Sequence, residues 1–272
     1  MYLYKDNARI YYEVSGKGEA LLLIHGVITD SALFEQTARI LSADLQVITY
    51  DRRGNSRSRK DTGDPDHEAF SLDEQAEDIR SLLDELGIGK VIIAGVSGGA
   101  VIGEFFLEKY PERVEHLIMY EPAMLGHMMK EDPEFREWSE KTKALLDAGK
   151  VNSALLRFSQ HLGPHDELSP AKSQEVSERE LGNIVYAFNS EIPAFHSYIP
   201  NQEIIKANAD RITLAAGDKS GDTAYVREAR RLAGLTGSRV IFFPGGHNLP
   251  YDRPAEFAVC VMGTIKLRKH LF

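Results

Sequence analysis

A serine lies among glycines in the segment AGVSGGA, residues 94–100, directly after the apolar run KVIIAG. Gly95 and Gly99 stand two residues before and after Ser97, which gives the spacing G-x-S-x-G. In a sharp turn from a buried strand into a helix, small residues at these positions let the two chain segments pass each other. The helix then directs free N–H groups and its positive dipole end at the serine oxygen, which favours a developing negative charge. The spacing therefore predicts that Ser97 is a nucleophile.

The same glycines would also suit a phosphate-binding loop, or a turn that only packs a helix tightly on a strand. A dinucleotide-binding loop needs G-x-G-x-x-G, and a nucleotide phosphate loop needs G-x-x-x-x-G-K followed by Ser or Thr. Neither pattern occurs in the chain. A packing turn without a chemical role remains the alternative to a nucleophile.

Three further segments, taken with G-x-S-x-G, make the sequence resemble the α/β-hydrolase superfamily over nearly its whole length. LLLIHG followed by Val27 is similar to the family's strand and oxyanion loop. YDRRGNSRS, residues 50–58, resembles the family's D-x-R-G-x-G-x-S loop, although Asn55 and Ser56 depart from its usual spelling. FFPGGHNLP, residues 242–250, is similar to the family's last strand and histidine turn.

This resemblance implies roles for four residues. The backbone N–H groups of Val27 and Gly98 would form an oxyanion hole, and His247 would be the general base. His25 would shape the oxyanion loop by packing.

Four other histidines fall in a region that we expect to be a helical insertion: His127, His161, His165 and His196. His161 and His165 are four residues apart, but Gly163 and Pro164 lie between them and prevent the helical turn that would bring them together. The sequence therefore predicts no metal site.

The family usually supplies the acid that orients its histidine after the penultimate strand, three residues beyond a glycine. Here Gly217 leads to Ser220 at that position, and a serine carries no negative charge to stabilise an imidazolium. Asp218 and Asp222 lie two residues before and two residues after it. Such shifts in a short turn change the direction in which a side chain points.

The superfamily also places its acid at the end of the strand that follows the nucleophile's helix. LIMYEP puts Glu121 there, closely resembling the layout of haloalkane dehalogenases, whose nucleophile is an aspartate. A buried carboxylate needs a partner, and His247 would be a suitable one. We predict Glu121 as the acid. Asp218 is the first alternative, Asp222 the second, and a salt bridge or backbone contact of Glu121 without catalysis also stays open.

Ser97, His247 and Glu121 together would catalyse acyl transfer without a metal or organic cofactor. We expect a carboxylic-ester hydrolase of the EC 3.1.1 type with a small or medium hydrophobic substrate, because apolar side chains of the insertion would line a pocket. They are Met124, Leu125, Met128, Met129, Phe158, Phe188 and Phe195. Lactone, thioester, carbon–carbon and peracid chemistry use similar triads. A non-catalytic ligand-binding protein on the same fold is the second hypothesis, because no acid follows Gly217 at the usual position.

The elements that must position these residues read as strands alternating with helices. Strands are predicted over 8–14, 20–26, 46–51, 90–95, 116–121, 211–217 and 239–245. The last six are continuous and apolar, which is typical of a parallel sheet covered by helices on both faces. SLDEQAEDIRSLLDELG has Ser71 as N-cap and Glu74 to complete a capping box, and PAEFAVCVMGTIKLRKH predicts a helix near the C-terminus.

The alternation of strands and helices fails between residues 121 and 211. We predict an α/β-hydrolase fold whose core comprises residues 1–122 and 206–272, with residues 123–205 as a helical lid over the carboxyl ends of the strands.

Composition excludes several classes of partner. The net charge of −9 and a single basic run, residues 51–60, argue against nucleic acid binding. No apolar run has the length of a membrane span or the layout of a signal peptide, so we expect no membrane partner and a cytoplasmic protein. The lone Cys260 excludes an intrachain disulfide. Oligomeric state is not predicted.

Overall fold

A computed structural model of the chain describes residues 1–5, 8–60, 69–161 and 178–268. Its strands form one sheet in the order β1-β2-β4-β3-β6-β7-β8-β9, and β5 pairs with β2. Pairing is parallel from β4 across to β9 and antiparallel for β1, β2 and β5. The strands are Tyr2–Lys5 (β1), Ala8–Ser15 (β2), Glu19–Ile24 (β3), Leu45–Tyr50 (β4), Arg59–Lys60 (β5), Val91–Val96 (β6), Val114–Tyr120 (β7), Ile212–Gly217 (β8) and Ile241–Phe243 (β9).

The sheet is covered by helices on both faces, as predicted. Side chains alternate between the faces: Leu21 and Leu23 pack with one apolar cluster, and Leu22 and Ile24 pack with the other. The first cluster includes residues of α1 (Glu35–Leu41) and α12 (Pro254–Arg268). The second includes residues of α2 (Leu72–Glu85), α3 (Gly98–Lys109) and α10 (Ala224–Thr236). Burial on both faces explains why the strands are continuous apolar runs.

Helix α2 begins as its sequence predicts. The hydroxyl of Ser71 accepts a hydrogen bond from the N–H of Glu74, at 3.4 Å. Its apolar residues Ile79, Leu82 and Leu83 are buried. Further short helices are Ser31–Phe34 (η1), Pro111–Arg113 (η3), Gln202–Ala207 (α9), Ala209–Arg211 (η5) and Leu249–Asp252 (α11).

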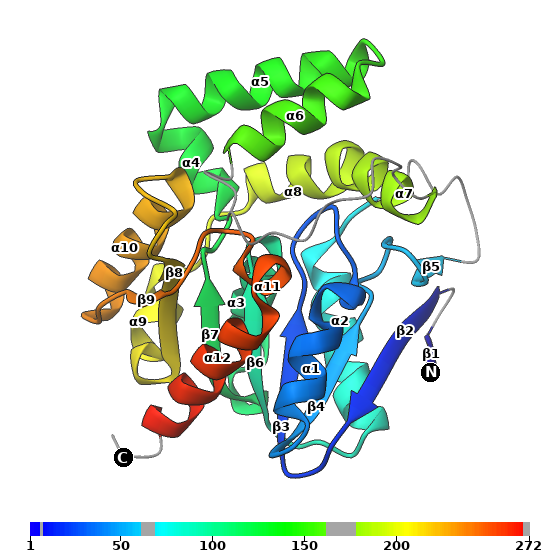
Figure 1. Cartoon of the computed structure of the whole chain (residues 1–272), viewed down its shortest axis with the longest axis vertical. Coiled ribbons are helices and arrows are strands. Elements are labelled where there is room, and N and C mark those ends of the chain that lie inside the picture. Colours follow the sequence, from blue (N-terminus) through cyan, green and yellow to red (C-terminus); the bar gives the residue numbers. More distant parts are fainter. Residues whose placement is uncertain (6–7, 61–68, 162–177, 269–272) are drawn as a thin grey trace.

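A group of helices between β7 and α9 lies above the carboxyl ends of the strands in Figure 1. We call this group the cap helices: Leu125–Glu131 (α4), Pro133–Asp147 (α5), Val151–His161 (α6), Glu178–Tyr186 (α7), the π-helical turn Ala187–Glu191 (η4) and Ile192–Ser197 (α8). Their separation from the core as a lid over residues 123–205 remains a prediction.

The structure differs from the predicted elements at the two edges of the sheet. Strands β1 and β5 were not predicted, and both are held by pairing with β2. The predicted strand over 239–245 is limited to Ile241–Phe243, where Ile241 and Phe242 are exposed because β9 has a neighbour on only one side. Among the described residues, no helix combines the length and the apolar character that crossing a membrane requires.

Candidate active site

Four neighbouring parallel strands end at the same edge of the sheet. The register pairs Val96 of β6 with Tyr120 of β7, and Tyr120 with Ala215 of β8. Gly217 at the end of β8 pairs with Phe243 of β9. The turns that follow these strands carry Ser97, Glu121, Ser220 and His247 in that order. Side chains that are up to 150 residues apart in the sequence (247 − 97) therefore gather at one edge.

Ser97 stands at the bend between β6 and α3 in a backbone conformation that is rare for a residue with a side chain. Its φ of 55° and ψ of −119° lie outside the strand and helix regions. A Cβ on Gly95 would lie 2.5 Å from the carbonyl oxygen of Gly99, and a Cβ on Gly99 would lie 2.2 Å from that of Ile24. The two glycines therefore allow the close approach that the sequence pattern indicates, and α3 begins directly after the serine.

Glu121 and His247 form a buried hydrogen bond, with 2.6 Å between Oε2 and Nδ1. Because an ionised carboxylate only accepts hydrogen bonds, Nδ1 carries the proton and Nε2 is the nitrogen left for another partner. The second oxygen of Glu121 accepts hydrogen bonds from the N–H of Gly217, at 2.8 Å, and from the Ser220 hydroxyl. Glu121 also has a positive φ, 44°, and is fully buried.

The partners of Glu121 keep its carboxyl group ionised. Burial by itself would raise the pKa of Glu121. The hydrogen bond and charge of His247, followed by the hydrogen bonds from Ser220 and Gly217, outweigh that effect and hold the pKa below its ordinary value. A negative charge is therefore maintained beside the ring of His247.

The two alternative acids lie elsewhere. Asp218 is exposed, and its Oδ1 accepts the N–H of Gly245 at 2.8 Å, so it supports the turn that carries His247. Asp222 is exposed too and forms an ion pair with Arg230 at 2.7 Å. The structure thus brings Glu121, and neither aspartate, to the histidine ring.

Tyr120 connects the serine turn with the histidine turn. Its carbonyl oxygen accepts the N–H of Ser97 at 2.9 Å, and its hydroxyl donates to the carbonyl of Gly246 at 2.6 Å. The ring of Tyr225, at the start of α10, packs on the His247 ring with 4.7 Å between centroids. Both residues were missed in the sequence, where their apolar neighbours mark them only as core.

The predicted oxyanion residues lie side by side. A Cβ on Gly98 would be 3.1 Å from Cγ1 of Val27, and a Cβ on Gly26 would be 3.2 Å from Cβ of Ser97. The carbonyl oxygen of Gly26 accepts hydrogen bonds from Nδ1 of His25 at 2.8 Å, from the Thr29 hydroxyl at 3.1 Å and from Nη2 of Arg52 at 2.9 Å. In a planar trans peptide the next N–H points the opposite way, so these donors fix the direction of the Val27 N–H.

His25 is neutral and holds this loop. Burial, with the nearby charge of Arg52, lowers the pKa of His25 to about 3. With Nδ1 donating to Gly26, Nε2 accepts the backbone N–H of Arg52 at 3.1 Å. This geometry agrees with the packing role expected for His25.

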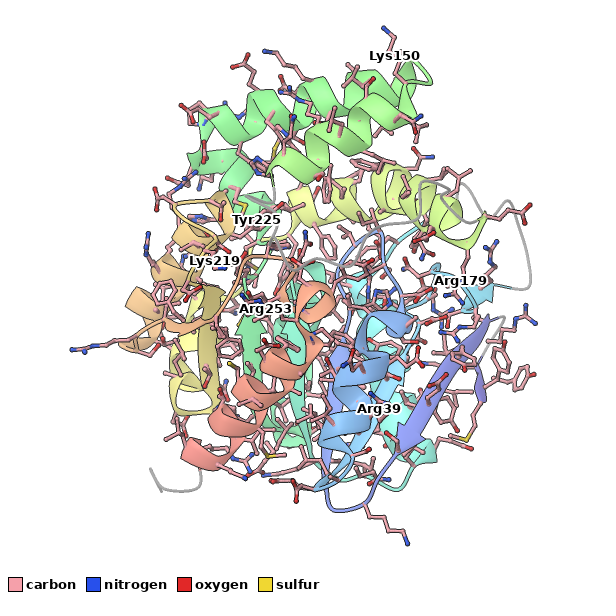
Figure 2. The ribbon with its side chains drawn as sticks, viewed as in Figure 1. Arg39, Lys150, Arg179, Lys219, Tyr225 and Arg253 are labelled. Carbon is pink, nitrogen blue, oxygen red and sulfur yellow. The ribbon has the colours of Figure 1, made fainter. Side chains whose placement is uncertain are left out.

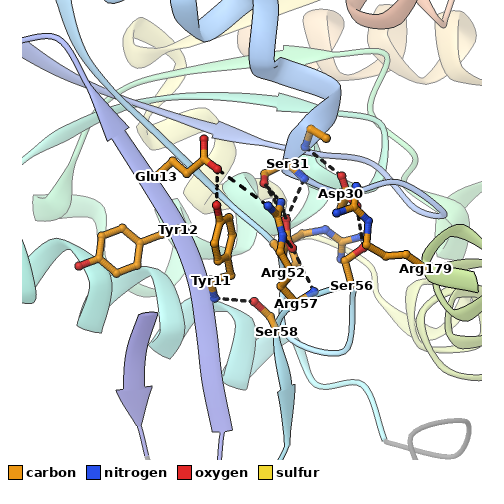
Figure 3. A network of polar contacts seen from close by, with 12 residues as sticks. Tyr11, Tyr12, Glu13, Asp30, Ser31, Arg52, Ser56, Arg57, Ser58 and Arg179 are labelled. Atoms are coloured by element: carbon orange, nitrogen blue, oxygen red, sulfur yellow. Dashed lines mark hydrogen bonds and ion pairs between the residues drawn. The ribbon is translucent and has the colours of Figure 1, made fainter. Parts of the chain in front are cut away.

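The loop that resembles D-x-R-G-x-G-x-S forms a polar network, shown in Figure 3. Asp51 accepts hydrogen bonds from the Ser31 hydroxyl at 2.6 Å and from Nε of Arg57 at 2.7 Å. The hydroxyl of Ser56 donates to Asp30 at 2.7 Å, and Asp30 pairs with Arg179 of α7 at 3.0 Å. Ser56 departs from the family pattern, and the structure uses it to link this loop to the residues after the oxyanion loop.

An apolar cavity of about 240 Å³ lies within the cap helices. Its floor includes Tyr225, the residue that packs on His247, and Figure 2 shows Tyr225 below the cap helices. Leu125, Met129, Phe158 and Phe188, four of the predicted pocket residues, line it. The others pack elsewhere; Phe195, for example, contacts the serine turn, since a Cβ on Gly98 would lie 3.1 Å from its ring.

A second hollow, of about 740 Å³, borders the residues that follow Val27. It is lined by Ile28 and Thr29, by residues of α1 and α7, and by Pro250 and Tyr251 after the histidine turn. Acidic and basic side chains both border it, including Arg39 and Arg179, which Figure 2 labels.

Within the described residues, no three or more His, Cys, Asp or Glu side chains are placed to hold a metal ion. His165, the second histidine of the HLGPH segment, lies outside the described part of the chain.

Comparison with known proteins identifies the wider group. Residues 19–254 match the family model described as "alpha/beta hydrolase fold". The "Uncharacterized hydrolase YraK" of Bacillus subtilis is 31% identical over 248 residues, which cover 88% of this chain and 86% of that protein. A solved carboxylesterase structure from Nitrososphaera gargenis has a TM-score of 0.73 at 20% identity and covers 100% of both chains. The structure of Est816, an N-acyl homoserine lactone degrading enzyme, has a TM-score of 0.69 at 20% identity and covers 97% of this chain and 99% of the other.

Proposed function

This chain belongs to the alpha/beta hydrolase fold family, and from that membership we propose that it is a serine hydrolase that cleaves carboxylic esters through an acyl-enzyme intermediate. The observation that carries this proposal is the hydrogen bond between Glu121 and Nδ1 of His247. It leaves Nε2 as the basic nitrogen at the edge of the sheet where Ser97 occupies its strained bend.

In the proposed reaction, Nε2 of His247 takes the proton of the Ser97 hydroxyl as its oxygen attacks the ester carbonyl. The new oxyanion is held by the N–H groups of Val27 and Gly98, each worth about 3 kcal/mol of barrier. His247 then donates the proton to the leaving alcohol, and Glu121 stabilises the imidazolium in between. A water molecule then gives a proton to Nε2 as its oxygen attacks the acyl carbonyl. The bond between the acyl carbon and Oγ of Ser97 breaks, the acid leaves, and Nε2 returns the proton to Oγ. The mechanism uses no metal or organic cofactor.

The cavity in the cap helices supports an apolar acyl group. Aromatic and aliphatic side chains line most of it, and Tyr225, one of these lining residues, packs on the ring of His247. Its volume of about 240 Å³ exceeds the roughly 150 Å³ of an engineered apolar cavity that binds benzene. We therefore assign the acyl part of a small or medium hydrophobic ester to this cavity, with the cap helices acting as the lid. The wider hollow with mixed charges suits the leaving alcohol and water.

A fluorophosphonate probe tests the proposal, because it phosphonylates a serine only when a base activates it. We expect stoichiometric labelling of the wild type, no labelling of Ser97→Ala, and a loss of roughly 10⁴-fold or more in ester turnover for Ser97→Ala or His247→Ala. A folded wild-type protein that takes up no probe would favour the non-catalytic ligand-binding hypothesis instead. Activity towards p-nitrophenyl esters of increasing chain length then defines the acyl preference.

A further inference from the structure

One cap-helix residue reaches the core of the protein as half of a fully buried ion pair. Glu191 is the last residue of the π-helical turn η4, and its carboxylate contacts Nη1 of Arg52 and lies 3.2 Å from Nη2. Nδ2 of Asn55 donates to the same carboxylate at 3.1 Å. Neither Arg52 nor Glu191 has any exposed side-chain surface. A π-helical turn interrupts a regular helix and is frequent at functional sites.

The same guanidinium group supports the oxyanion loop. Nη2 of Arg52, one of the two nitrogens that face Glu191, also donates to the carbonyl of Gly26 at 2.9 Å. The other two donors to this carbonyl, His25 and Thr29, belong to the oxyanion loop itself. Arg52 is therefore the donor that links the Gly26–Val27 peptide to a different part of the chain. The position of the Arg52 side chain is in turn fixed by its ion pair with Glu191.

Rotation of the Gly26–Val27 peptide would remove the proposed oxyanion donor. The carbonyl of Gly26 and the N–H of Val27 point in opposite directions across one planar peptide. If the carbonyl left Arg52, it would turn towards Ser97, where its partial negative charge would repel the oxyanion. Burying two charges gains little net stability even when they pair well, so the stability of the fold alone gives little reason for this ion pair.

We propose that Glu191 is a positioning residue that makes the oxyanion hole depend on docking of the cap helices. When the cap helices sit on the core, Glu191 holds Arg52, Arg52 holds the Gly26 carbonyl, and the Val27 N–H faces the reacting carbonyl. When they do not, the peptide loses its outside support and the hole is not formed. This inference rests on the proposed ester hydrolysis. It adds that the oxyanion hole, and with it the chemical step, forms only when the cap helices are docked on the core.

The chain contains a matched control for this ion pair. Arg53, the next residue, forms a buried pair with Asp78 of α2, with Nε to Oδ2 at 2.8 Å and Nη2 to Oδ1 at 2.6 Å. The two side chains are 4% and 0% exposed. Asp78→Asn thus neutralises a carboxylate that is equally buried and also pairs with an arginine of the same loop. In this second pair the arginine side chain supports α2 rather than Gly26.

The test compares Glu191→Gln with Asp78→Asn in the full-length chain. We expect Glu191→Gln to lower kcat on a p-nitrophenyl ester at least tenfold, with KM changed less than threefold, because the donor acts only on the transition state. The Ki of an alkyl trifluoromethyl ketone, whose adduct with Ser97 carries an oxyanion, should rise in parallel. Asp78→Asn should lower the melting temperature by a similar amount while kcat and this Ki stay within threefold of the wild type.

Asn55→Ala provides a milder variant in case Glu191→Gln does not fold. It removes one hydrogen bond from Glu191, so kcat should fall at least threefold and the Ki of the ketone should rise with it. Two results would overturn this inference while leaving the proposed function intact, provided that the wild type is active. The first is an unchanged Ki of the ketone in Glu191→Gln, or in Asn55→Ala if Glu191→Gln does not fold. The second is an equal loss of kcat in Glu191→Gln and Asp78→Asn. A wild type that neither hydrolyses esters nor reacts with fluorophosphonate would overturn the proposed function and this inference with it.

Discussion

The hydroxyl of Ser220 donates a hydrogen bond to Oε1 of Glu121, so the turn after β8 supports a carboxylate that comes from the turn after β7. Oε1 also accepts the N–H of Gly217, which leaves Oε2 for Nδ1 of His247. The carboxylate is thereby held on both of its oxygens. Ser220 occupies the position from which an acid was expected, and in this fold it serves as a hydrogen-bond donor to the group at Glu121.

This arrangement predicts that Glu121 and Asp218 differ sharply when each is neutralised. Glu121→Gln removes the charge that stabilises the imidazolium of His247 and should lower kcat for ester hydrolysis about 10³-fold to 10⁴-fold. Asp218→Asn keeps an oxygen that accepts the Gly245 N–H and should stay within fivefold of the wild type. Steady-state kinetics on one p-nitrophenyl ester measure both. Near wild-type turnover in Glu121→Gln would contradict the assignment.

Ser220→Ala should move the acidic limb of the activity profile to higher pH. The hydrogen bond from Ser220 is one of the interactions that lower the pKa of Glu121, so its removal lets that pKa rise. A raised pKa means that the carboxylate takes up a proton earlier as the pH falls. The pH dependence of kcat/KM measures the shift, and Ser238→Ala, at an exposed hydroxyl, is the control. Superimposable profiles for the wild type and Ser220→Ala would show that this hydrogen bond does not tune the site.

The sequence was sufficient to predict most of the fold because its information is local there. Continuous apolar runs, a capped amphipathic helix and a glycine-flanked bend all depend on neighbours within a few residues. Strand β5 escaped prediction for the opposite reason. Residues 59 and 60 form a strand because they pair with Arg9 and Ala8, about 50 residues away in the sequence, and no periodicity of their own indicates it.

In the candidate site, too, the features that depend on local sequence could be predicted and those that depend on distant contacts could not. The position of Ser97 follows from its glycines, whereas Glu121 and His247 were expected from the resemblance of their segments to the α/β-hydrolase superfamily. The contact between Arg52 and Glu191 joins residues 139 positions apart and depends on how the cap helices pack. The support of Glu121 by Ser220 likewise depends on the register between β7 and β8, which the sequence does not specify by itself.

Gly99→Ala should disrupt the bend at Ser97. The added Cβ would lie 2.2 Å from the carbonyl oxygen of Ile24 and 2.6 Å from that of His25, and backbone atoms cannot rotate away as a side chain can. We expect destabilisation by about 2 kcal/mol or more together with loss of fluorophosphonate labelling. Gly89→Ala, where the Cβ would meet nothing within 4 Å, is the control. Unfolding in urea and probe labelling measure the two effects, and an active, wild-type-like Gly99→Ala would refute the close packing.

Changing the volume of the cap cavity should change the preferred acyl chain. Phe188→Ala enlarges the cavity and should shift the optimum of kcat/KM towards longer p-nitrophenyl esters, whereas Met129→Trp fills it and should shift the optimum towards acetate. Leu156→Trp changes a side chain of α6 that is 61% exposed and controls for effects of an added ring on the cap helices. If both cavity variants keep the wild-type preference for acyl chain length, the acyl group does not bind in this cavity.

Glu104 of α3 should make the protein less stable as the pH rises. It is 1% exposed, and burial raises its pKa to about 8, with the nearby Glu108 adding to the rise and the hydrogen bond from Tyr198 opposing it. The Tyr198 hydroxyl, just after the cap helix α8, donates to Oε2 of Glu104 at 2.5 Å and lies 3.3 Å from Oε2 of Glu108. The folded protein therefore retains a proton on Glu104 at pH values where an exposed glutamate has lost it.

The sign of the effect follows from the protons bound in each state. Between about pH 4.5 and 8 the folded state binds more protons at Glu104 than the unfolded state, so the free energy of unfolding falls as the pH rises through this range. Glu104→Gln has no proton to lose and should be the more stable protein at pH 8, by a few kcal/mol at most. Urea unfolding at pH 5, 6, 7 and 8 measures the difference, which should grow with each step. As a control, Glu108→Gln changes the half-buried neighbour and should keep most of the wild-type slope of unfolding free energy against pH. If Glu104→Gln has the same slope as the wild type, another group causes the pH dependence.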